Sequence, residues 1–323
     1  QGTRVGLKTR PWVGSQVGTS LERKYNENGQ RVLANLGLVQ TWQVNERWSV
    51  SAGLDRSQTL LKEEVPPFNT NVPAAVGAFE DFTSVSLGTS YKQAYWSWAT
   101  RIETRQADTE KKWGITAGMY VEPEQGLGLS AGAQIFRTDT VASGESTQGD
   151  LRLGLAYRPW QSRWIFLDRL DYIFEEQTED TFTFDTWRLV NNLNANYKPN
   201  FKTQVALQYG LKYVQARFDQ SLYAGFTDLT GIEARYDLTE RWDVGVHGSV
   251  LHSWNADQLD YSTGLSAGYQ VMTNAWVSVG YNFVGFRDED FNNGSFTAQG
   301  PFIRFRFKMD QDSARRALTW FER

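Results

Sequence analysis

The sequence contains few residues that could carry out acid–base or nucleophilic chemistry. It has only two histidines, His247 and His252, and no cysteine, which excludes thiolate nucleophiles, disulfides and thiolate metal sites. His247 and Ser249 form the best-placed pair, because side chains two residues apart point to the same face of a strand. A histidine beside a serine hydroxyl is the arrangement of a nucleophile with its general base. The spacing fixes no Asn or Asp to orient the ring, so we predict no enzyme. The sequence has no Gly-rich phosphate loop, paired-Cys metal site or haem-attachment motif, so we predict no cofactor.

Asp288, Glu289 and Asp290 form the best single candidate for a cation site. Carboxylate oxygens are the ligands that Ca²⁺ prefers. The run lacks the spacing of a dedicated calcium loop, and a solvated loop charge explains it more simply. We therefore predict no metal site.

Basic residues recur at alternate positions and form a larger candidate site. Fixed positive charges along a pore wall raise the local concentration of anions, so such a wall favours anionic solutes. The alternative is that these charges pair across strands and keep the lumen wet and rigid. Both interpretations stay open for the predicted lumen-lining set, which is Arg4, Lys8, Arg101, Arg105, Arg152, Arg188, Lys212, Arg235, Arg304 and Arg306. The net charge of −4 gives no indication of nucleic-acid binding.

The elements that position these residues show strict period-two alternation. In the segments 96–105, 203–213 and 242–250 one face is apolar and the other is polar or small. The segments run for about 10 to 14 residues, which suits a tilted membrane crossing better than the roughly 5 to 6 residues of a soluble strand. A soluble β-sandwich would alternate in the same way, but with shorter strands. The pattern therefore favours strands that cross a membrane.

Composition supports the membrane interpretation. The chain has 13 Trp and 14% aromatic residues, yet no apolar stretch of about 18 residues that could form a transmembrane helix. A membrane protein without such a stretch must satisfy its backbone in a closed barrel. Tryptophans at segment ends predict an interfacial girdle of Trp12, Trp42, Trp48, Trp96, Trp164, Trp242 and Trp276.

We therefore predict an all-β fold, a transmembrane antiparallel up-and-down β-barrel of about 16 to 18 strands, in the outer membrane of a Gram-negative bacterium. Residues 1–309 form the barrel, and residues 310–323 form a periplasmic tail or short helix. Short turns alternate with longer connections at 62–80, 138–150, 175–185 and 287–294.

Counting these segments gives about 17 strands, and an odd number is unusual for bacterial barrels. The first segment, 3–10, then runs toward a short turn, which leaves the N-terminus outside. Either the count is wrong by one or the chain is the end of something longer.

Asp168 interrupts the apolar face formed by Trp164, Phe166, Leu170 and Tyr172. A charge on the lipid face is costly near the midplane. A β-bulge that re-aims the strand is the preferred explanation, and an outer surface covered by protein is the alternative.

The closing sequences GYNFVGFRDEDF (280–291) and GPFIRFRFK (300–308) carry a resemblance that begins near Asp150. This part of the chain resembles the C-terminal outer-membrane β-barrel of large repeat-containing envelope proteins of Gram-negative bacteria. In that family the two sequences look like the last hairpin of the barrel. Gly300, Ile303, Phe305 and Phe307 are similar to the terminal-strand signal that barrel-assembly machinery recognises.

Three functions remain open at this stage. The barrel is a membrane anchor or export barrel of a larger envelope protein, a porin-like channel with weak anion preference, or a sheath around a partner protein. The expected partners are outer-membrane lipid and lipopolysaccharide, the barrel-assembly machinery, and either an upstream region of the same polypeptide or a periplasmic or surface partner, with no nucleic acid.

Overall fold

A computed structural model of the chain describes residues 2–26, 29–64, 81–141, 144–179, 182–272, 275–286 and 298–307. Over these residues all the regular elements are strands, and no helix is long and apolar enough to cross a membrane. The predicted all-β class is confirmed, and the 17 strands of the described residues lie within the predicted range of 16 to 18. The strands are β1 Gly2–Thr9, β2 Ser15–Asn26, β3 Gly29–Gln43, β4 Trp48–Glu64, β5 Phe82–Lys92, β6 Trp96–Ala107, β7 Glu110–Glu124, β8 Leu127–Thr140, β9 Gly144–Tyr157, β10 Trp164–Thr178, β11 Thr183–Tyr197, β12 Thr203–Phe218, β13 Ser221–Asp237, β14 Trp242–Ser253, β15 Gln258–Met272, β16 Ala275–Val284 and β17 Gly300–Phe307.

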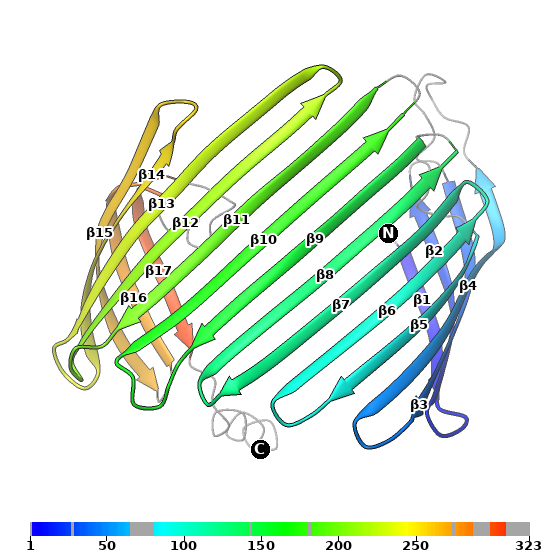
Figure 1. Ribbon diagram of the computed structural model, residues 1–323, viewed down its shortest axis with the longest axis horizontal. Coiled ribbons are helices and arrows are strands. Elements are labelled where there is room, and N and C mark those ends of the chain that lie inside the picture. Colours follow the sequence, from blue (N-terminus) through cyan, green and yellow to red (C-terminus); the bar gives the residue numbers. More distant parts are fainter. Residues whose placement is uncertain are drawn as a thin grey trace.

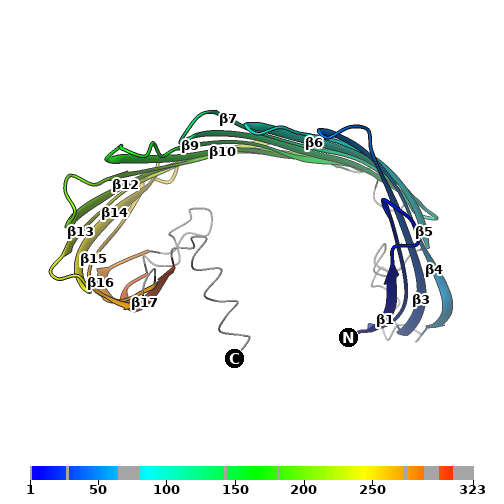
Figure 2. The same cartoon turned by 90° about the horizontal axis from the view of Figure 1, so that it is seen from below.

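The strands form one up-and-down sheet in which each strand pairs antiparallel with its neighbours in sequence (Figure 1). Seen from below, the sheet is an arc, with β1 at one end and β17 at the other (Figure 2). In the described part of the chain β1 pairs only with β2, and β17 pairs only with β16. The sheet therefore keeps two open edges.

The apolar residues lie on the convex face of this arc, with little cover from the rest of the chain. Ile102, Ile232 and Leu265 each expose more than half of their surface, and the described buried residues include more polar than apolar side chains. A soluble sandwich would bury this face against a second sheet. Here the apolar face is turned outward, toward lipid, and the polar face inward. The chain has the architecture of an outer-membrane β-barrel.

Several predicted long connections are in fact strand. Only residues 141–143 separate β8 from β9, and only residues 179–182 separate β10 from β11, so the predicted loops at 138–150 and 175–185 were wrong. Polar residues there continue the ladder, because strands that extend beyond the lipid need no apolar face. The predicted connection at 62–80 begins in β4, and its remainder, like 287–294 and 310–323, lies outside the described residues.

The predicted bulge at Asp168 is also wrong. The pairing of β10 with β9 and with β11 is continuous through Asp168, which stays on the outer face. Asn191 of β11 donates a hydrogen bond from Nδ2 to Asp168 Oδ1 at 2.7 Å. The carboxylate thus has a polar partner on the same face, and the strand keeps its register.

The predicted tryptophan girdle lies at the end of the sheet that carries the short turns. Trp12 lies in the first of these turns, and Trp42, Trp48, Trp96, Trp164 and Trp242 lie at strand ends. The rings of Trp48, Trp96, Trp164 and Trp242 contact neighbouring aromatics, for example Trp48 with Tyr91 at 5.0 Å between centroids and Trp242 with Tyr269 at 4.8 Å. Trp276 does not belong to this belt. It pairs with Arg306, whose guanidinium lies 5.3 Å from the ring centroid, so it lies on the inner face.

Candidate functional site

The register places all ten predicted lumen-lining basic residues on the concave face. For example, Gly88 is paired with Arg101, Arg101 with Thr116, and Thr116 with Gln134 on successive strands. Side chains at paired positions point to the same face of a sheet. Arg101, Arg105, Arg152, Arg188 and Lys212 all fall on this face, as do both basic residues of β1 and the three arginines of the C-terminal strands. All ten basic side chains therefore share one face of the sheet.

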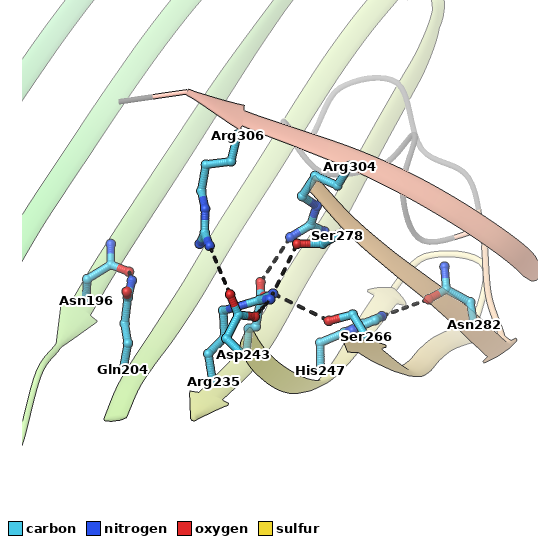
Figure 3. Close-up of polar contacts among 11 residues, drawn as sticks. Asn196, Gln204, Arg235, Asp243, His247, Ser266, Ser278, Asn282, Arg304 and Arg306 are labelled. Carbon is cyan, nitrogen blue, oxygen red and sulfur yellow. Dashed lines mark hydrogen bonds and ion pairs between the residues drawn. The ribbon is translucent and has the colours of Figure 1, made fainter. Parts of the chain in front are cut away.

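The C-terminal strands bring three of these arginines together in an ion-pair network (Figure 3). Arg235 of β13 is buried and bonds both Glu233, at 2.9 Å, and Asp243 of β14. Arg304 of β17 reaches Glu233 at 3.2 Å, and Arg306 lies 3.8 Å from Asp243. β17 thus contacts a strand four positions away along the sheet, which is feasible only on a tightly concave face.

Small residues make room for this network. Ser266 of β15 and Ser278 of β16 lie beneath Arg235, with hydroxyl oxygens 3.4 and 3.5 Å from its Nη atoms. At Gly268 a Cβ would lie 2.6 to 2.8 Å from the carboxylate of Asp243, closer than real Cβ contacts come. Any larger residue at that position would push Asp243 away from Arg235.

His247 has an orienting partner that the sequence did not reveal. Its Nε2 lies 2.8 Å from Oδ1 of Asn282, which is fully buried and donates from Nδ2 to the carbonyl of Ala298 at 2.9 Å. Gly264 separates the two side chains in the sheet, and a Cβ there would come within 2.5 Å of Asn282 Oδ1. The glycine allows His247 and Asn282 to meet across an intervening strand.

This arrangement lacks the bond that a nucleophile and its base require. Ser249 shares a hydrogen bond with Ser262 at 2.7 Å, and within the described residues no hydrogen bond joins Ser249 to His247. His247 instead ties β14 to β16 and, through Asn282, to the segment before β17. The geometry is that of a structural connection.

A second ion-pair cluster lies in the middle of the sheet. Asp171 of β10 is buried and accepts hydrogen bonds from Arg152 of β9 at 2.7 Å and from Arg169 at 2.6 Å. Both guanidinium groups are half exposed, so the carboxylate holds two cations at the lumen surface. Arg188 and Lys212 lie on the adjoining strands β11 and β12 of the same face.

The first seven strands line a basic hollow on the concave face, with a volume of about 760 Å³. Six basic and three acidic side chains line it. Arg4 donates from Nε to Ser20 at 3.1 Å, Arg101 pairs with Glu103 at 3.3 Å, and the guanidinium of Arg105 lies 4.0 Å from the Phe82 ring centroid. Lys8 also lines the hollow. The basic side chains that line the hollow therefore outnumber the acidic ones.

The described residues contain no group of three side chains that could hold a metal ion. The candidate run 288–290 lies outside them.

The predicted assembly signal forms the C-terminal edge of the sheet. Ile303 and Phe305 of β17 point outward, with 59% and 67% of their surfaces exposed. Gly300 begins the strand with a φ of 127°, and Phe307 ends it.

Comparison with known proteins identifies no family. No protein-family profile matches the chain, and no curated protein matches its sequence. Among solved structures, the outer membrane channel DcaP of Acinetobacter baumannii is 15% identical, with a TM-score of 0.42, over 83% of this chain and 84% of that one. BamA from Haemophilus ducreyi lacking POTRA domains 1-3 is 12% identical, with a TM-score of 0.39, over 94% and 70%. The copper transporter OprC is 9% identical, with a TM-score of 0.47, over 94% and 64%.

Proposed function

We propose that this chain is the membrane-anchoring barrel of a larger envelope protein, similar to the large repeat-containing envelope proteins that its sequence resembles. We also propose that it is not an enzyme. The observation that carries the proposal is the network on β13–β17, where the inner-face arginines are paired with carboxylates of the same sheet. Charges used in this way hold strands together, and they offer little to a passing solute. Outer-membrane lipid would cover the convex face, and the assembly machinery would bind β17.

The mass of the mature protein tests this proposal. The polypeptide purified from outer membranes should be heavier than the 36.9 kDa of the present chain. Protease added to spheroplasts or intact cells should remove the additional region and leave the strands protected. A mature protein with the mass of residues 1–323 would leave nothing to anchor and would refute the proposal.

The basic hollow on β1–β7 favours a second function, a diffusion channel with weak anion preference. In a planar bilayer under a salt gradient, such a channel would give steady conductance steps with a reversal potential on the anion-selective side. Replacing both Arg101 and Arg105 with Gln should shift that potential toward cations, because fixed wall charge sets the local counter-ion concentration. Arg137→Gln, at an exposed pair with Glu145, is the matched control.

A protein that inserts without conducting would contradict the channel and agree with the anchor. A sheath around a partner would be identified by a second polypeptide that co-purifies in equal amount.

A further inference from the structure

The two open edges of the sheet run in the same direction. Sixteen antiparallel pairings separate β1 from β17, so the two strands are parallel to each other, and both end on the side of the short turns, at Thr9 and Phe307. Figure 2 shows the edges on either side of the opening in the arc. The direction of these edges limits what can close the barrel.

Each edge needs a partner in the membrane. An eight-residue edge strand directs about half of its backbone N–H and C=O groups away from its only neighbour, and hydrocarbon offers those groups nothing to bond. The outward side chains at the edges are apolar and strongly exposed, with 72% for Val5 and 69% for Leu7 on β1. Both edges therefore lie at membrane depth, and a free edge there is not a stable end state.

We propose that the barrel is closed by an odd number of strands, of which the first and the last run opposite to β1 and β17, and that the same polypeptide supplies them upstream of Gly2. This inference depends on the proposed function, since it assigns part of the larger protein to the membrane. One such strand added to the 17 described would give 18, an even number as in bacterial single-chain barrels.

Three other ways of covering the open edges fit less well: direct contact between β1 and β17, a second copy of the chain, and residues 308–323. Direct contact between β1 and β17 would be parallel, and β17 is held inward by the bonds from Arg304 to Glu233 and from Arg306 to Asp243. A second copy inserted in the same orientation presents edges of the same direction, so its pairing would be parallel too. Residues 308–323 do not alternate apolar with polar as a crossing strand must.

An upstream strand would continue the existing order. All the described strands pair with their sequence neighbours, and Gly2 lies at the end of the sheet opposite the short turns, so a hairpin there would lead back into a strand antiparallel to β1. The inner side of β1 carries Arg4 and Lys8. The adjoining strand should therefore place apolar residues outward and acidic or polar residues inward.

Cross-linking in the full polypeptide tests the closure, since the present 323 residues contain no cysteine. The edge pair is Leu7→Cys with Ile303→Cys. The positive controls are Leu7→Cys with Thr19→Cys and Val279→Cys with Ile303→Cys, which are Cα partners in the sheet. After oxidation in intact outer membranes, the controls should form intramolecular disulfides and the edge pair should form none.

A benzophenone side chain placed at position 7 or 303 then identifies the neighbour of each edge. We expect both positions to give adducts with the same polypeptide, upstream of Gly2. An edge-to-edge disulfide, or adducts only with a second polypeptide, would overturn the closure. Either result leaves the anchor proposal intact if the mature protein still has its upstream mass, so the two failures are distinguishable.

Discussion

Gly264 gives the sharpest test of the inner-face network. In Gly264→Ala the new Cβ would lie 2.5 Å from Asn282 Oδ1 and 2.6 Å from His247 Cε1. Asn282 is fully buried and its amide nitrogen is bonded to the Ala298 carbonyl, so it cannot turn away without losing that bond. The substitution should break the 2.8 Å contact between His247 and Asn282 and leave a buried amide oxygen unsatisfied.

The expected magnitude follows from two opposing effects. An unsatisfied buried group lowers stability by about 1–3 kcal/mol, and alanine in a strand regains roughly 0.5–1 kcal/mol relative to glycine. Gly118→Ala on the same face is the matched control, because a Cβ there meets nothing within 4 Å. The control should therefore be slightly stabilising. The two variants should differ by about 2 kcal/mol in the free energy of unfolding.

Equilibrium unfolding in urea from detergent micelles or vesicles, followed by tryptophan fluorescence, measures this difference. Replacing both His247 and Asn282 with Ala removes the two side chains that the new Cβ would meet, so in that background Gly264→Ala should have the same small effect as Gly118→Ala. Equal midpoints for the two single variants, or an unchanged cost in the background without His247 and Asn282, would show that Gly264 does not serve this contact.

Three further predictions test the remaining features. Arg235→Gln should lower the free energy of unfolding by about 3 kcal/mol, because it removes the nearest cation from the buried carboxylate of Asp243, whereas Arg137→Gln at an exposed pair should have a far smaller effect in the same urea titration. Asn191→Leu should destabilise the protein in vesicles, and adding Asp168→Leu should reverse the loss, because the double variant removes the uncompensated charge from the lipid face; no reversal would contradict this. Trp276→Phe should slightly raise the fraction of fluorescence quenched by brominated lipids, because it removes a tryptophan that lipid does not reach, and a decrease would place that ring in the lipid.

The sequence predicted the faces of the strands well, because period-two alternation depends only on neighbouring residues. It placed Arg235 and Arg304 on one face, where both contact Glu233, without any knowledge of this partner. Trp276 was misplaced since its position at a strand end suggested the girdle, although its parity with Ser278 and Asn282 puts it on the inner face. For Trp276, parity was the better guide.

Asn282 was missed because its contact depends on two registers at once. The hairpin between β15 and β16 pairs Met272 with Ala275, and counting back from that pair would place Phe283 opposite Gly264. A register shift between Gln270 and Met272 moves Asn282 into that position. An irregularity of one residue exchanges an outward side chain for an inward one, and no local pattern reports it.

The size of the inner-face side chains explains where the sheet bends. Crowding on the concave side opposes curvature, and glycine relieves it. The inner face of β14–β16 carries Gly245, Gly264 and Gly268 with small serines between them, and there the sheet turns inward so far that β17 contacts β13 (Figure 2). The middle of the arc carries the larger Asn192 and Gln208 and is flatter. The small residues that make room for the ion-pair network therefore also determine which way the C-terminal edge faces. That direction determines where a closing strand has to lie.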